Sequence, residues 1–227
     1  MRLRLLGGTM SLLLLVTLPL LAADKDYSIK TEKTPAPNDV QEPIRKLLGD
    51  RCIRLTSAKG DLLAELWLCK DVAAKATDAQ IKNGLTYREV PESTVFGVIR
   101  FPKQITDYRK QKIPAGVYTL RLAIQPMDGD HMGTAPYSEF LLMSPVAEDK
   151  TPDKMEAKKL QEMSGKTTGG HPGVLLLFPG KAGTTDPKLE TQEENHWVVY
   201  FLLDVKIGDK KSQLPVGLTL IGASSAA

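Results

Sequence analysis

The sequence is poor in the residues from which most small reactive sites are built. Its 227 residues include two cysteines and three histidines. The two cysteines do not have the C-x-x-C spacing of a metal or redox motif. H-E-x-x-H, G-x-S-x-G and glycine-rich phosphate-binding motifs are also missing. The sequence therefore identifies no reaction, and it favours a protein without enzymatic activity.

An excess of charge of one sign is lacking as well. The chain has 30 basic and 27 acidic residues, a formal net charge of +3. Removing Arg2 and Arg4 with the leader described next would leave 28 basic residues, a net charge of about +1. Lysines and acidic residues are interspersed along the chain, so a nucleic-acid surface is not expected.

Long apolar runs are confined to the first residues. A basic start (Met1–Arg4), an apolar stretch (Leu5–Leu21) and a small-residue exit (Ala22-Ala23) form the pattern of a secretory signal over residues 1–23. This predicts export, to the periplasm or the extracellular space. The apolar stretch of about 17 residues is marginal for a bilayer, and a retained N-terminal membrane anchor is the alternative. No membrane span is expected after cleavage.

The rest of the chain reads as one domain with polar ends. Residues 24–43 are polar and contain three prolines, which predicts a linker. Residues 44–222 contain no internal boundary, and residues 223–227 (ASSAA) are expected to form a disordered tail.

Strand signals dominate this domain. The clearest is Gly116–Gln125, where Tyr118, Leu120, Leu122 and Ile124 alternate with a second set that includes Thr119 and Arg121, so one face is expected in the core and the other in water. The further expected strands are 52–56, 62–69, 93–101, 138–143, 173–178, 196–205 and 214–221. Short helices are expected within 42–48, 71–84 and 151–165. About eight strands with one or two appended helices predict a mainly β fold, an antiparallel β-sandwich of immunoglobulin-like or jelly-roll-like type.

The first two strands form a predicted hairpin that brings the cysteines together. If Gly60-Asp61 form the turn, Cys52 lies opposite Cys69. If Lys59-Gly60 turn instead, Cys52 faces Trp67 and Cys69 is a diagonal neighbour. Either arrangement brings the thiols close, and an oxidising compartment would favour a disulfide between Cys52 and Cys69. Two buried free thiols, or half of a metal site, are the alternatives.

One phrase resembles a known strand entry. Many extracellular β-sandwich modules have a loop-to-strand entry that is similar to the segment Lys112-Ile-Pro-Ala-Gly-Val-Tyr-Thr-Leu120. There a buried Tyr at the Tyr118 position bonds a backbone group through its hydroxyl. With Asp128-Gly-Asp-His-Met-Gly-Thr134 and Gly170-His-Pro-Gly-Val-Leu175, the phrase also resembles a group of uncharacterised exported bacterial proteins. The resemblance implies export and a β-sandwich, and no activity.

The three histidines are the candidate metal ligands. His131 follows Asp128-Gly-Asp130 in a polar loop, His171 lies in a Gly- and Pro-containing loop, and His196 begins a strand. Imidazoles with one or two carboxylates suit a divalent metal, with Asp128 and Asp130 as further candidates. Turn chemistry alone also explains the Asp-Gly-Asp run.

The aromatic residues near His196 are expected in the core. Trp197 alternates with Val199 and Phe201, which would leave His196, Val198 and Tyr200 together on an exposed face. The leading hypothesis is an exported, non-catalytic module that binds or scaffolds in the periplasm or cell envelope, with an envelope protein or glycan as partner. The alternative is a metal-binding or metal-dependent protein that uses His131, His171 and His196 with Asp128 or Asp130.

Overall fold

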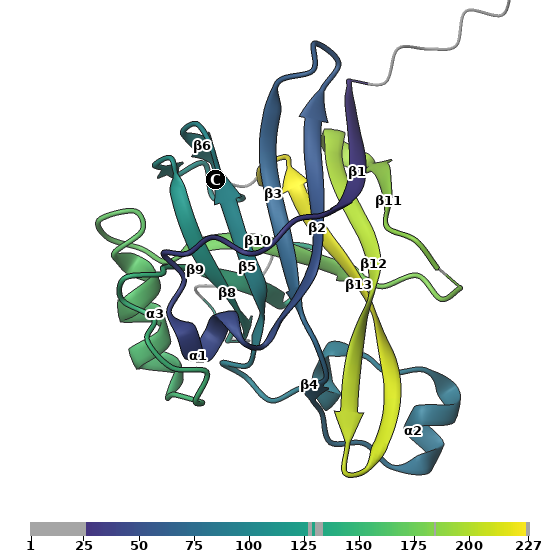
Figure 1. Ribbon diagram of the computed structural model, residues 1–227. Helices are drawn as coiled ribbons and strands as arrows, with labels where there is room; N and C mark the ends of the chain where they lie inside the picture. Colours follow the sequence, from purple (N-terminus) through teal and green to yellow (C-terminus); the bar gives the residue numbers. More distant parts are fainter. Residues whose placement is uncertain (1–25, 127–128, 130–133, 184, 226–227) are drawn as a thin grey trace, which may run out of the picture.

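The computed structural model describes residues 26–126, 129, 134–183 and 185–225, and this part of the chain is mainly β-structure (Figure 1). Eleven strands form one sheet, ten of them in the order β1-β2-β3-β5-β8-β9-β10-β13-β12-β11. The eleventh strand, β4, lies parallel to β12, and the other neighbours along the path are antiparallel. Strands β6 and β7 pair separately. The mainly β fold is thus confirmed, as one large curled sheet.

The elements have the following bounds. The strands are β1 (Tyr27–Lys33), β2 (Leu48–Ser57), β3 (Leu62–Cys69), β4 (Val72–Ala73), β5 (Val95–Phe101), β6 (Ile105–Thr106), β7 (Lys112–Ile113), β8 (Gly116–Ile124), β9 (Glu139–Pro145), β10 (Gly173–Pro179), β11 (Lys188–Gln192), β12 (His196–Ile207) and β13 (Lys210–Ile221). The helices are α1 (Glu42–Arg45), α2 (Asp78–Asn83) and α3 (Ala157–Gly165), with 3₁₀ turns η1 (Tyr87–Glu89) and η2 (Glu193–Asn195). Among the described residues, no helix has the length and apolarity needed to cross a bilayer.

The sheet curls until its two end strands meet. Strands β1 and β11 terminate the path of neighbours, and they contact each other along one side of the molecule (Figure 1). The ring of Tyr27 on β1 packs edge-on against Trp197 on β12, with centroids 5.0 Å apart. Each end of the sheet therefore covers part of the other.

Strand β10 joins the two halves of the curl. Its first four residues, Gly173–Leu176, pair with β9, and its last three, Leu177–Pro179, pair with β13. A strand that changes partner along its length is a common way to turn a corner between layers. The direction of the sheet changes here, close to the pocket described below.

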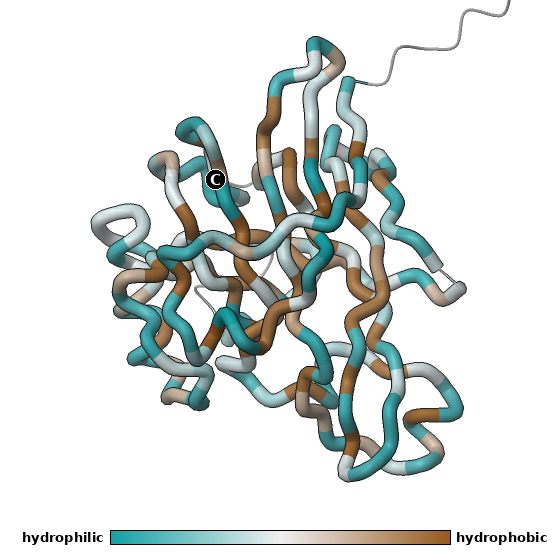
Figure 2. The backbone as a smooth tube through the Cα atoms, viewed as in Figure 1, coloured by the Kyte–Doolittle hydropathy of each residue, from teal (hydrophilic) through white to brown (hydrophobic). Residues whose placement is uncertain are grey.

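The main core fills the inside of the curl. Buried residues from both halves meet there, among them Cys52, Leu66, Leu120, Phe201 and Leu218. A second cluster lies on the outer face of β9 and β10, where Leu160 of α3 covers Leu142 and Leu176. Figure 2 shows hydrophobic residues concentrated along the central strands, while the outer loops are mostly hydrophilic.

All eight expected strands are present, with ends within a few residues of the expected ones, and five further strands were not expected. One of these, β1, lies inside the expected linker. It pairs with β2 along its whole length, from Tyr27 with Ser57 to Lys33 with Arg51. The linker prediction is therefore wrong for residues 27–33. Its polar composition reflects an edge strand whose residues are partly exposed.

The water-facing side expected for Gly116–Gln125 is also wrong. Arg121 and Thr119 are fully buried. Arg121 forms an ion pair with Asp149, with a 2.7 Å Nε–Oδ2 distance, and donates to the carbonyl groups of Ser93, Thr151 and Asp153. Because residues 151 and 153 supply carbonyl groups to Arg121, α3 begins at Ala157 rather than near Thr151.

The strand entry at Tyr118 has the geometry that the resemblance implies. Tyr118 is buried, and its hydroxyl donates to the carbonyl of Pro114 at 2.8 Å. The bond ties the start of β8 to the loop that precedes it.

Candidate functional site

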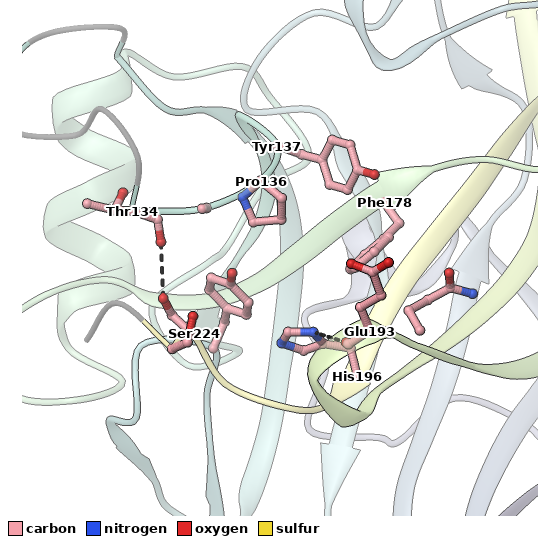
Figure 3. Close-up of a pocket in the computed structure, with 11 residues that line it drawn as sticks. Thr134, Pro136, Tyr137, Phe178, Glu193, His196 and Ser224 are labelled. Atoms are coloured by element: carbon pink, nitrogen blue, oxygen red, sulfur yellow. Dashed lines mark hydrogen bonds between the residues drawn. The ribbon is translucent and has the colours of Figure 1, made fainter.

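A pocket of about 470 Å³ opens where five distant parts of the chain converge. Its walls come from residues 134–137 before β9, from the end of β10, from η2 with the start of β12, and from the C-terminal residues 224 and 225, with Tyr108 between them. Figure 3 places Pro136, Tyr137 and Phe178 on one side, and His196 and Ser224 on the other. The volume lies in the range of small-molecule sites.

His196 is buried at the base of this pocket, with 3% of its surface exposed. Its Nδ1 lies 2.9 Å from the carbonyl oxygen of Glu193 (Figure 3). A carbonyl oxygen can only accept a hydrogen bond, so Nδ1 carries the proton and Nε2 of the neutral ring is an acceptor. Nε2 is buried and has no hydrogen-bond partner among the described residues. Buried polar atoms in proteins nearly always have a partner, which sets Nε2 apart from most buried acceptors.

Two aromatic rings hold the imidazole. The centroid of Tyr108 lies 5.6 Å from that of His196, and the centroid of Phe178 lies 6.0 Å from it. Tyr137 in turn packs edge-on against Phe178 at 5.0 Å. The strip of His196, Val198 and Tyr200 is therefore buried, and the expectation of an exposed strip is wrong, because Tyr108 and Phe178 cover His196.

Asp107 fixes the position of Tyr108. Its carboxylate accepts hydrogen bonds from the backbone amides of Arg109, Gln111 and Val174 at 2.8–3.0 Å. Burial raises the pKa of this carboxyl above its usual value, against the effect of these bonds. The turn is thereby tied to β10, and the Tyr108 amide donates to the Val174 carbonyl at 3.2 Å.

The C-terminal segment closes one wall of the pocket. The amide of Ser224 donates to the carbonyl of Tyr108 at 2.7 Å, and its hydroxyl donates to the carbonyl of Thr134 at 3.1 Å. Gly222 packs directly on the imidazole, because a Cβ there would lie 2.2 Å from Cδ2 of His196. Ser224 is buried, so the expectation of a disordered tail is wrong at this residue.

The structure describes two of the three histidines that were expected to bind metal. His196 lines the pocket, whereas His171 is exposed in the loop before β10, where its carbonyl accepts a bond from the Thr168 hydroxyl. His131, Asp128 and Asp130 lie outside the described residues. Within the described part of the chain, no group of three or more His, Cys, Asp or Glu residues could hold a metal ion.

The two cysteines are buried and not bonded to each other. Cys52 pairs with Trp67 across the hairpin, which is the second of the two registers considered, and an irregularity then places Cys69 opposite Leu48. The predicted disulfide is absent because neither cysteine faces the other across the ladder. Burial raises the pKa of each thiol to about 12.

Most pocket residues other than His196 carry no signal in the sequence. Tyr108, Tyr137, Phe178 and Glu193 lie in turns or at strand ends, far apart in the chain. Only the position of His196 at a strand start, followed by aromatic residues, marked the region.

Searches against protein-family models, curated proteins and solved structures found no match for this chain.

Proposed function

We propose that this protein is an exported, non-catalytic binding module whose ligand occupies the pocket around His196. In this proposal the curled sheet acts as a two-layer sandwich scaffold of immunoglobulin-like or jelly-roll-like type. The leader-like pattern of residues 1–23 supports a location in the periplasm or outside the cell. Binding sites are commonly carried by loops and strand ends on such rigid scaffolds.

The buried acceptor of His196 carries the proposal. Leaving a buried polar atom unpaired costs about 1–3 kcal/mol, so such an atom at a pocket wall needs an explanation. A ligand that donates a hydrogen bond to Nε2 would remove this cost. The rings of Tyr137 and Phe178, both half-buried, would supply apolar contact to the same ligand. The ligand could be free or part of a cell-envelope glycan or protein.

Two variants, each replacing a native alanine with tryptophan, test the site. Ala135 lines the pocket, and Ala58 lies exposed in the turn between β2 and β3. Small-molecule fragments would be screened for binding to purified protein by ligand-observed NMR. We expect hits that bind wild type and Ala58→Trp equally and that are lost in Ala135→Trp. An absence of hits, or hits insensitive to Ala135→Trp, would reject the pocket as the binding site.

A metal-dependent role is the second candidate, and the His196 geometry favours it specifically. An imidazole whose Nδ1 donates to a backbone carbonyl presents Nε2 in the form that binds metal. His131 and His171, with Asp128 or Asp130, would be the further ligands. Elemental analysis of protein purified without chelators, and after addition of zinc, tests this role. A metal content near zero in both samples would reject it.

A further inference from the structure

The formal charge in the pocket is of one sign. Glu193 is the only charged residue among the described residues that line it, and none of them is a lysine or an arginine. The Glu193 side chain is exposed, and Figure 3 shows its carboxylate directed toward Phe178. An anionic ligand would therefore meet a negative charge without a compensating cation in the described part of the pocket wall.

His196 adds a second hydrogen-bond acceptor to the pocket, in addition to the Glu193 carboxylate. Because its Nδ1 proton is committed to the carbonyl of Glu193, Nε2 offers a lone pair and no proton in the neutral ring. Nε2 is closed to solvent in the pocket as it stands. A ligand gains this bond only when a neighbouring wall moves aside, and the group that it offers must be a donor.

The aromatic rings have the same preference. Phe178 and Tyr137 are half-buried and line the pocket, and the Glu193 carboxylate is directed toward Phe178 (Figure 3). The face of an aromatic ring carries partial negative charge and attracts an ammonium group placed over it. Carboxylate, imidazole lone pair and ring faces thus favour a positively charged hydrogen-bond donor.

We propose that the pocket binds an organic ammonium compound. Its N–H groups bond to the carboxylate of Glu193 and to Nε2 of His196, and its carbon skeleton packs on Tyr137 and Phe178. This inference rests on the proposed function, and it names the ligand class. A neutral alcohol could donate to Nε2 but would not gain the attraction of the carboxylate or of the ring faces.

Three probes of one shape and different charge test the inference. Benzylammonium, benzyl alcohol and benzoate share a ring and a one-carbon or carboxyl substituent, and each fits easily within about 470 Å³. Their dissociation constants would be measured at pH 7 by NMR titration of the purified protein. We expect benzylammonium to bind at least tenfold more tightly than benzyl alcohol, and benzoate to show no binding.

The carboxylate is tested by a conservative exchange. Glu193→Gln keeps the size and removes the charge, and it should reduce the preference for benzylammonium over benzyl alcohol to less than threefold. Glu162→Gln is the matched control, because Glu162 lies exposed on α3 and does not line the pocket. The control should retain the wild-type preference.

The imidazole is tested by His196→Phe. This variant keeps a ring between Tyr108 and Phe178 but removes the Nε2 acceptor, so benzylammonium affinity should fall severalfold. Because the variant also loses the bond to the Glu193 carbonyl, its thermal unfolding is measured alongside. If it does not fold, the Glu193→Gln result decides.

Three outcomes would overturn the inference. Benzyl alcohol or benzoate binding as tightly as benzylammonium would reject the ammonium class, and so would a Glu193→Gln variant that keeps the wild-type preference. Failure of all three probes would also reject it. The fragment screen with Ala135→Trp judges the binding pocket independently, so hits of another class there would leave the proposed function intact.

Discussion

The hydroxyl of Tyr87 accepts a hydrogen bond from the amide of Gly217 at 2.9 Å. The same hydroxyl donates to the carbonyl of Phe178 at 2.6 Å. Phe178 and Gly217 are themselves partners in the ladder between β10 and β13. One tyrosine from η1 therefore bridges the two strands where the halves of the curled sheet join.

Tyr87→Phe should destabilise the protein by about 1–3 kcal/mol, because both buried backbone groups lose their partner while the ring volume is kept. The measurement is urea unfolding followed by tryptophan fluorescence. Tyr27→Phe is the control, because Tyr27 is half-buried on the end strand β1 and should cost less than about 1 kcal/mol. Equal losses in the two variants would contradict the bridging role.

Asp149→Asn should cost about 3–5 kcal/mol, because Arg121 would be left as a buried charge without its partner. The neighbouring residue supplies the control. Glu148 pairs with Lys166 at the surface, where both side chains are substantially exposed, so Glu148→Gln should change stability by less than about 1 kcal/mol. Chemical unfolding of both variants checks the contrast, and a small loss in Asp149→Asn would speak against a structural role for the pair.

Both thiols should be unreactive in the folded protein and reactive once it unfolds. Cys52 and Cys69 are buried, and their raised pKa leaves almost no thiolate at pH 8. Iodoacetamide labelling followed by mass spectrometry should therefore add no group under native conditions and two groups in guanidinium. A protein that stays unlabelled in guanidinium until a reductant is added would reveal a disulfide.

Stability should decline as the pH rises above about 9. The thiols begin to ionise near pH 9 in the unfolded chain, whereas the folded state keeps them protonated until about pH 12. Each thiol then lowers the free energy of unfolding by about 1.4 kcal/mol per pH unit across this interval. Cys69→Ala should lower stability at pH 7 but reduce the slope between pH 9 and 10.5. An unchanged slope would show that the thiol does not titrate as expected.

Gly222→Ala should destabilise the protein more than Gly60→Ala. Both glycines have positive φ, 119° and 82°, so each substitution carries a conformational cost of about 1 kcal/mol. Only at Gly222 would the new Cβ collide with a neighbour, the ring of His196, while nothing lies within 4 Å at Gly60. Thermal unfolding would measure the difference, and benzylammonium affinity should fall only in Gly222→Ala. Equal losses of stability in the two variants would mean that the His196 ring can shift away from the new Cβ without a loss of stability.

The sequence predicted those elements whose pattern of apolar residues, or whose hydrogen-bonding partner, lies within a few residues along the chain. The eight expected strands carry continuous or alternating apolar residues, and the phrase around Tyr118 contains both ends of its hydrogen bond within five residues. By contrast, β1 is half-exposed and is followed by a proline-containing segment, so its pairing with β2 has no local signature. Arg121 occupies a position that alternation assigns to water, because its partner Asp149 is far along the chain.

The pocket was beyond prediction for a related reason. Tyr108, Tyr137, Phe178 and His196 meet only because β10 changes partner and the C-terminal segment folds back over Tyr108. Neither event has a signal in residue composition. His196 was identified as a candidate residue, but its setting was expected to be a surface strip or a metal site.

The position of β13 in the sheet affects when folding can finish. This strand lies between β10 and β12, although it ends only at Ile221. A chain that emerges from a ribosome or a translocation channel with its N-terminal side first can form the β1-β2-β3-β5-β8-β9-β10 portion early. It cannot join the two halves until β13 is free. During that interval the inner face of the early portion is uncovered, which is when binding by a chaperone or association between chains would compete with folding.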